Sequence, residues 1–371
     1  MKIAVPAEIK NNEFRVAITP SGVHELTAAG HQVFIQTNAG EGSSISDQDY
    51  IAAGAQIMPD APSTWNIADL VLKVKEPIAS EYQYLRPGLL LFTFLHLAAD
   101  PELTKELLAK EVTAIAYETV QTPNRQLPLL APMSEVAGRL SVLVGAQSLF
   151  AQNGGHGILL GGVPGTRSAK VAILGGGVAG TNAIAMAVGL GADVTVLDTN
   201  INRLRELDSI YHGRLKTLAS NSFEIDRAVS QADLVIGSVL IPGAKAPKLV
   251  TNALVKKMKP GSVLVDIAID QGGCFEDSKP TTHAEPTFKV HQSIFYCVAN
   301  MPGAVAHTST YALTNATLSY AKALANKGWL EACKADHSLA LGLNTHAGKL
   351  VNQPVAEAHS LPYSDLDALL A

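Results

Sequence analysis

The chain has 371 residues, of which 47% are hydrophobic and only 16% are charged, so its composition excludes an intrinsically disordered protein. Its length favours two domains of ordinary size. The 28 basic and 33 acidic side chains give a formal net charge of -5, which argues against nucleic acid or an anionic membrane surface as a partner.

Cysteine usage and apolar runs indicate the compartment. Cys274, Cys297 and Cys333 form no zinc-type cluster, which is typical of a reducing environment. The densest apolar run, Leu89–Ala99, contains a histidine and is shorter than the ~20 residues that a membrane span needs. Met1–Val5 does not resemble a secretory signal. We therefore expect a cytoplasmic chain with no membrane segment.

Short apolar runs alternate with helical patterns in the first third of the chain. This alternation is typical of parallel βαβ units rather than of a sandwich. The expected helices are Ser21–Ala29 and Glu102–Lys110, and the expected strands are Lys2–Val5, His31–Gln36, Leu70–Val74, Leu89–Phe94 and Val112–Ala116.

One long helix is expected over Met133–Gln152, because Pro132 precedes it and two glycines follow it. The turn-rich segment Gly154–Gly165 is expected to mark the boundary to a second unit.

The second unit repeats the alternation, so the predicted fold is α/β with two doubly wound, Rossmann-like domains. The pattern leaves open which domain the last two helices contact. Those two helices are expected over His307–Asn326 and Trp329–Asp336. In the second unit, a helix is expected over Val178–Leu190. Its expected strands are Lys170–Leu174, Asp193–Leu197, Leu215–Ala219, Asp233–Ile236, Ser262–Ile267 and Ile294–Cys297.

A glycine fingerprint joins the first strand of the second unit to its helix. In LGGGVAG, Gly175 permits a tight turn, Gly177 allows the backbone to approach a pyrophosphate, and Gly180 allows close packing of helix and strand. The following strand ends in Asp198, whose carboxylate can accept hydrogen bonds from the ribose hydroxyls of NAD and would repel the 2′-phosphate of NADP. Arg203 nearby weakens that exclusion.

Four charged or titratable residues lie in or beside apolar segments and are candidates for chemistry. Arg15 and Lys75 could bind a carboxylate, or could be a surface arginine and a solvated strand end. His96 is either a core histidine or an acid/base group. Asp270 follows a buried-looking strand and precedes two glycines, at the edge where doubly wound sheets bind ligands.

At these segments the chain resembles NAD-dependent L-alanine dehydrogenases, over essentially its whole length. The motifs that carry the resemblance are KNNEFRVAITP (Lys10–Pro20), LVLKVKEP (Leu70–Pro77), LLFTFLHLAAD (Leu90–Asp100), LGGGVAG (Leu174–Gly180), VDIAIDQGG (Val265–Gly273) and VANMPGAV (Val298–Val305).

The resemblance implies a role for each candidate. Arg15 and Lys75 bind the substrate carboxylate and carbonyl, and His96 and Asp270 form the acid/base pair. The implied cofactor contacts, besides Gly175, Gly177, Gly180 and Asp270, are Ser134, Val178, Ala179, Asp198, Arg203, Ser220, Val239, Leu240, Ile267, Ala268, Ile269, Lys279, Val298, Ala299, Asn300 and Met301.

The resemblance also implies two domains joined by long helices, with the active site in the cleft between them, and a homohexamer. The substrate domain would comprise residues 1–130 and 306–371, and the NAD-binding domain residues 131–305. Some family members have a metal site at a position like Glu118, but Lys327 stands where its histidine partner would be, so no metal is predicted.

The implied reaction is reversible oxidative deamination of L-alanine to pyruvate and ammonia, through iminopyruvate, with hydride transfer to NAD. One alternative is the soluble NAD-binding component of a nicotinamide nucleotide transhydrogenase, which shares both domains and the glycine loop. A second is a catalytically silent NAD-binding regulator or scaffold.

Overall fold

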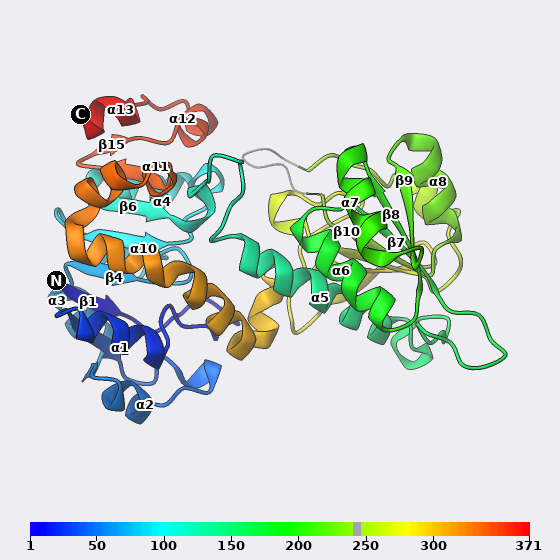
Figure 1. Ribbon diagram of the computed structural model, residues 1–371, viewed down its shortest axis with the longest axis horizontal. Coiled ribbons are helices and arrows are strands. Elements are labelled where there is room, and N and C mark those ends of the chain that lie inside the picture. Colours follow the sequence, from blue (N-terminus) through cyan, green and yellow to red (C-terminus); the bar gives the residue numbers. More distant parts are fainter. Residues whose placement is uncertain (240–245) are drawn as a thin grey trace. The chain divides into compact units, whose positions relative to one another are not determined.

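The computed structural model describes residues 1–239 and 246–371. They divide into two compact units. Unit 1 comprises Met1–Met133 and Val305–Ala371, and unit 2 comprises Ser134–Ala304. In Figure 1 the blue N-terminal and red C-terminal ends of the chain both belong to unit 1.

Unit 1 is built on a sheet of eight strands among the described residues, in the order β15-β14-β6-β5-β4-β1-β2-β3. The strands from β6 to β3 in this order are parallel, whereas β14 and β15 are antiparallel. The strands are β1 (Lys2–Val5), β2 (Gln32–Gln36), β3 (Gln56–Met58), β4 (Leu70–Leu72), β5 (Leu90–Thr93), β6 (Thr113–Ala116), β14 (Leu343–His346) and β15 (Lys349–Leu350).

Local signals explain where the helices of unit 1 begin. The Thr19 hydroxyl accepts a hydrogen bond at the start of α1, and Pro20 is its first residue. The helices are α1 (Pro20–Ala28), α2 (Asp47–Ala52), α3 (Ala61–Ile67), α4 (Pro101–Ala109), α10 (Ala306–Ala335), α11 (His337–Ala340), α12 (Gln353–His359) and α13 (Leu366–Leu370).

Unit 2 contains a second sheet, of seven strands in the described part of the chain, in the order β12-β13-β11-β10-β7-β8-β9. All neighbours are parallel except β12 and β13. The strands are β7 (Lys170–Leu174), β8 (Asp193–Asp198), β9 (Leu215–Ala219), β10 (Leu234–Gly237), β11 (Val263–Asp266), β12 (Thr287–Val290) and β13 (Ser293–Tyr296). The helices are α5 (Ala131–Ser148), α6 (Val178–Gly189), α7 (Ile201–Tyr211), α8 (Ser222–Gln231) and α9 (Asn252–Val255).

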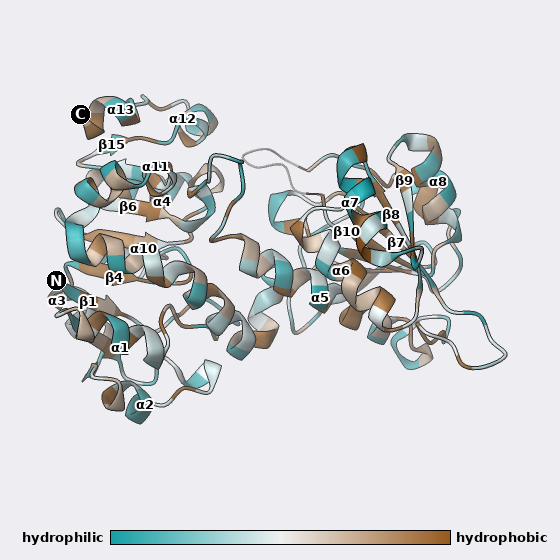
Figure 2. Ribbon diagram, viewed as in Figure 1, coloured by the Kyte–Doolittle hydropathy of each residue, from teal (hydrophilic) through white to brown (hydrophobic). Residues whose placement is uncertain are grey.

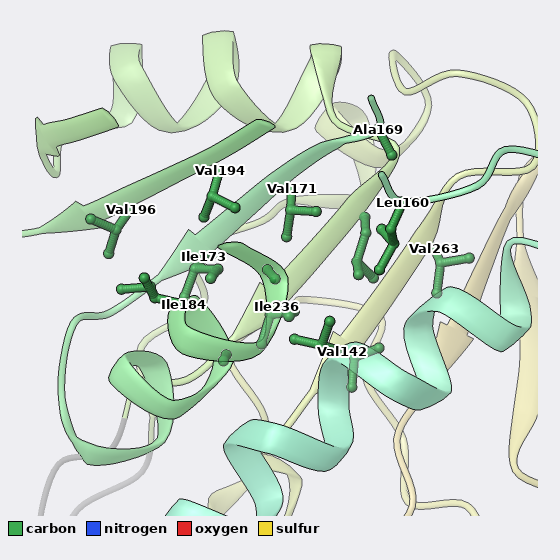
Figure 3. Close-up of a cluster of buried hydrophobic side chains, with 14 of the residues drawn as sticks. Val142, Leu160, Ala169, Val171, Ile173, Ile184, Val194, Val196, Ile236 and Val263 are labelled. Atoms are coloured by element: carbon green, nitrogen blue, oxygen red, sulfur yellow. The ribbon is translucent and has the colours of Figure 1, made fainter. Parts of the chain in front are cut away.

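The sheet of unit 2 carries apolar cores on its two faces. In Figure 3, Val171 and Val194 on adjacent strands face the same layer as Ile184 of α6 and Val142 of α5. The hydropathy colouring of Figure 2 shows brown strands between helices of mixed colour. Burial on both faces explains the continuous apolar runs of the parallel strands.

Each sheet has a point where the strand order reverses. In unit 1 it lies between β1 and β4, and in unit 2 between β7 and β10. Open α/β sheets bind ligands at such points, beyond the carboxyl ends of the strands. The predicted α/β class with two doubly wound domains is therefore confirmed.

The expectation about the glycine-rich segment after α5 was wrong. Gly154–Gly165 lies inside unit 2 rather than at a boundary. There a Cβ at Gly155 would lie 2.3 Å from the Leu149 carbonyl, so this glycine serves a tight chain reversal. The expected break between the two C-terminal helices is confirmed, because α10 has a non-helical backbone at Gly328, where φ is 75°.

Candidate functional site

The glycine loop between β7 and α6 has the geometry of a phosphate cradle. Gly175 has a φ of +99°, and a Cβ at Gly180 would lie 1.9 Å from the Gly175 carbonyl oxygen. At Gly177, by contrast, a Cβ would meet no described atom within 4 Å. Gly175 and Gly180 are therefore required by the conformation and packing of the loop itself. Gly177 leaves open space beside the loop, where a ligand can approach the backbone.

The N-terminus of α6 suits an anion. Among the described residues, no side chain caps this helix at Gly177, whereas Asn200 caps α7 and Asn221 caps α8. Its first N–H groups and the helix dipole are thus directed at the open side of the glycine loop. These features fit the pyrophosphate of NAD.

Asp198 and Arg203 are both tied to this loop. Asp198 Oδ2 accepts a hydrogen bond from the Gly176 N–H at 2.7 Å. The Arg203 guanidinium donates to the Gly176 carbonyl at 2.7 Å and to Thr181 Oγ1 at 2.5 Å, and it also pairs with Glu206. Arg203 therefore supports the loop. Because Glu206 partly neutralises its charge, Arg203 would attract the 2′-phosphate of NADP less strongly.

The other predicted cofactor contacts gather mainly at one edge of the sheet in unit 2. They follow the carboxyl ends of β9, β10, β11 and β13, next to the glycine loop after β7. Leu240 lies outside the described residues, and the exposed Lys279 follows no strand; its Nζ lies 4.6 Å from the Phe288 ring centroid. Those at the edge are Ser220, Val239, Ile267, Ala268, Ile269, Asp270, Val298, Ala299, Asn300 and Met301; Val178 and Ala179 open α6, and Ser134 lies in the first turn of α5.

Arg15 lies in the loop between β1 and α1 and is not a surface arginine, because only 3% of it is exposed. Its Nε and Nη2 donate to the two carboxylate oxygens of Glu13 at 2.7 and 2.5 Å, and its Nη1 contacts Met133 Sδ. This two-point ion pair fixes the plane of the guanidinium.

Lys75 follows β4, and its side chain is 16% exposed, so it is not a freely solvated strand end. Its Nζ lies 3.9 Å from Glu76 Oε2, and Glu76 also pairs with Lys10. Burial would raise the pKa of Glu76, but the two lysines lower it below its usual range. An ionised Glu76 thus holds two ammonium groups at this edge of the sheet.

His96 follows β5, and the structure shows that it is not a core histidine, because 42% of its side chain is exposed. Its backbone is left-handed, with a φ of 51°, and its ring is parallel to Phe94 at 5.7 Å. Glu118 Oε1 accepts the His96 N–H at 2.6 Å, and Nδ1 lies 4.0 Å from the same oxygen. Glu118 therefore holds the residue in a conformation that presents the imidazole to solvent.

Arg15, Lys75 and His96 thus occupy loops after β1, β4 and β5, which are adjacent strands of unit 1. The fourth candidate, Asp270, belongs to unit 2 and lies exposed on a short 3-10 turn, Ile269–Gln271, after β11. The structure brings the first three to one sheet edge at a reversal point.

Sequence reasoning missed a buried charged group beneath Lys75. Lys73 is 1% exposed, and its Nζ lies 3.1 Å from Glu8 and 2.9 Å from Glu81. Glu8 also accepts the Val74 N–H at 2.6 Å. Burial raises the pKa of Glu8, against the opposing effect of Lys73. The signal that could have found Lys73 is its place between two apolar residues at the end of a strand.

No group of three or more His, Cys, Asp or Glu side chains within residues 1–239 and 246–371 could hold a metal ion. In the same residues, no helix is long and apolar enough to cross a membrane.

Comparison with known proteins gives the family. The alanine dehydrogenase/PNT N-terminal domain model matches residues 4–137, and the C-terminal domain model matches residues 141–353. The alanine dehydrogenase of Mycolicibacterium smegmatis is 62% identical over 371 residues, which is all of both chains.

Solved structures agree with these matches. An L-alanine dehydrogenase superposes with a TM-score of 0.94 at 54% identity, covering 97% of this chain and 99% of the other. A transhydrogenase from Sinorhizobium meliloti has a TM-score of 0.83 at 26% identity, covering 95% and 100%. The resemblance inferred from the motifs is confirmed: the chain belongs to the alanine dehydrogenase family.

Proposed function

We propose that this chain is an NAD-dependent alanine dehydrogenase, which reversibly converts L-alanine, NAD and water to pyruvate, ammonium, NADH and a proton. The observation that carries the proposal is the identity of 62% over the whole length of an alanine dehydrogenase. The lower identity of the transhydrogenase, 26%, disfavours the alternative.

Unit 2 would bind the cofactor. The open side of Gly177 and the uncapped start of α6 fit the pyrophosphate, and Asp198 would accept hydrogen bonds from the adenosine ribose. When bound, NAD accepts the hydride released from the substrate Cα. The residues that follow β10, β11 and β13 would surround the nicotinamide side.

Unit 1 would bind the substrate. Arg15 and Lys75 would neutralise the alanine carboxylate, and Lys75 would also polarise the carbonyl oxygen of pyruvate. Support comes from the two-point pair with Glu13 and the contact with Glu76, which restrain the two cations before substrate arrives. Such restraint reduces the side-chain entropy lost on binding.

His96 and Asp270 would move the protons. Water must lose a proton when it attacks iminopyruvate, and the amino group must gain one before ammonia leaves the carbinolamine. His96 suits the first task because its ring is exposed while Glu118 holds its backbone. Asp270, exposed after β11, would orient the water or take part in the second transfer.

Two further points belong to this proposal. The chain would assemble as a hexamer, which rests on the family alone. It would act in the cytoplasm, and support comes from its three cysteines, which are buried and form no disulfide.

Initial rates of NADH formation test the proposal. We expect the wild type to reduce NAD only when alanine is present. The variant Lys75→Met should show a kcat/KM for alanine at least tenfold lower. Hydride exchange with a nucleotide analogue, without any response to alanine, would support the transhydrogenase reading instead. NAD binding with neither activity would support a silent scaffold and contradict the proposal.

A further inference from the structure

Asp270 stands on a turn that is held from the inside by a buried carboxylate. Asp266, the last residue of β11, is fully buried. Its Oδ1 accepts the Ala268 N–H at 3.0 Å, and its Oδ2 accepts the Cys274 N–H at 2.9 Å and the Ser278 hydroxyl at 2.5 Å. One side chain thus joins the beginning and the end of the turn.

The same turn is held from the outside by an ammonium group. Lys248 Nζ donates to three carbonyl oxygens, those of Gly272 at 2.6 Å, Gly273 at 2.9 Å and Phe275 at 2.9 Å. Asp266, by contrast, accepts hydrogen bonds from backbone N–H groups, from the Ser278 hydroxyl and from the Cys274 thiol. Lys248 and Asp266 therefore bind opposite dipoles of the same backbone, the C=O groups and the N–H groups respectively.

The backbone around Lys248 adds to this support. The Ala246 N–H donates to the Gln271 carbonyl at 3.2 Å, and the Leu249 N–H donates to the Cys274 carbonyl at 2.8 Å. Val250 and Phe275 form a parallel bridge. The segment Ala246–Val250 thus runs beside the turn along its second half.

The turn leaves no space for another arrangement at its centre. Gly273 has a φ of +73°, and a Cβ there would lie 2.6 Å from Asp266 Oδ2 and 2.7 Å from Ser278 Cβ. The close approach of backbone and carboxylate therefore depends on glycine at this position.

We propose that Lys248 and Asp266 are positioning residues for Asp270: together they fix the turn Ala268–Phe275 so that the Asp270 carboxylate is held at the carboxyl edge of the sheet. The proposal rests on the proposed function, in which Asp270 takes part in proton transfer. Lys248 and Asp266 themselves act only through the turn.

The test compares Lys248→Met with Lys257→Met. Lys257 is a matched control, because it is also a lysine of unit 2, and its surface ion pair at 2.6 Å is with Asp226 of α8 rather than with the turn. For each variant, hydrogen exchange of the peptide 266–278, the melting temperature, the Kd for NADH, and kcat and KM for alanine are measured.

Lys248→Met is expected to speed exchange in peptide 266–278 but not elsewhere, and to lower kcat about tenfold while KM for alanine changes less than threefold. Lys257→Met is expected to match the wild type. Asp266→Asn replaces one carboxylate oxygen, an acceptor, by an amide NH2, a donor. In the fraction that folds, it should also speed exchange in peptide 266–278 and lower kcat more than Lys248→Met does.

Unchanged exchange in peptide 266–278 of Lys248→Met would overturn the proposal. An unchanged kcat in Lys248→Met, with a lower melting temperature as its only defect, would also overturn the proposal. Lys248 would then stabilise the fold without positioning Asp270. If the wild type lacks alanine activity, the proposed function fails, yet the exchange measurement still decides whether Lys248 holds the turn.

Discussion

Glu8 and Lys73 form a buried ion pair, with 3.1 Å between Oε2 and Nζ, at the point where the strand order of unit 1 reverses. Glu8 belongs to the loop after β1 and Lys73 follows β4, so the pair joins the two adjacent strands whose loops carry Arg15 and Lys75. Glu81 completes the group at 2.9 Å from the same ammonium.

Lys73→Met is predicted to lower the free energy of unfolding by about 3–5 kcal/mol, because two buried carboxylates lose their counter-charge. Urea unfolding at neutral pH measures this. In the double variant Glu8→Gln/Lys73→Met the loss should be smaller than the sum of the two single losses. If Lys73→Met lowers the free energy of unfolding by less than about 1 kcal/mol, Lys73 would interact with Glu8 and Glu81 only as weakly as an exposed ion pair does.

Gly180→Ala is predicted to weaken NADH binding at least tenfold, because its Cβ would lie 1.9 Å from the Gly175 carbonyl oxygen and force the cradle apart. Gly189→Ala is the matched control in the same helix, since a Cβ there meets no described atom within 4 Å. The control should bind NADH normally and be slightly more stable. Fluorescence titration with NADH and thermal melts compare the two, and equal affinities would contradict the assignment of the cradle.

Asp198→Ala is predicted to lower kcat/KM for NAD by about 10- to 100-fold, because the ribose loses a hydrogen bond to a charged acceptor. It should also raise the ratio of NADP to NAD activity, because the carboxylate that would repel the 2′-phosphate is removed. Asp193→Asn is the control, because Asp193 begins the same strand and its ion pair among the described residues is with the exposed Lys216. Rates with both nucleotides measure the ratio. A ratio that Asp198→Ala leaves unchanged would exclude the ribose contact.

Acid is predicted to weaken unit 1 through Glu76. Its pKa is lowered by Lys75 and Lys10 despite burial, so its contribution to stability is present above its usual pKa of 4.5 and is lost as the pH falls through the lower folded-state value. Lys10→Met should therefore lower the melting temperature at pH 7, and the difference from the wild type should shrink in acid. A difference that is constant with pH would contradict this.

The sequence predicted the nucleotide-binding part of the fold most closely. The strand, glycine loop, helix and acidic residue from Lys170 to Asp198 lie within one residue of their expected bounds, because turn chemistry and periodicity agree there. The break in the C-terminal helix was also expected, at the place where Gly328 stands.

Features that depend on distant segments escaped prediction. β14 pairs with β6 across more than 200 residues, and no local pattern indicates such a pairing. The division between Met133 and Ser134 falls inside α5, where the helical pattern is continuous, so the expected bound at residue 130 came from the family resemblance and not from a local pattern. Likewise, Glu8 and Asp266 are ordinary acidic residues in the sequence, and their partners become evident only in the folded chain.

The most direct test of the account is the stoichiometry of the reaction of the purified chain with L-alanine and NAD. We predict that one pyruvate and one ammonia appear for each NADH, and that His96→Ala binds NADH like the wild type while its kcat falls at least a hundredfold. NADH formation without pyruvate, or no alanine-dependent NADH from a folded chain that binds NAD, would contradict it.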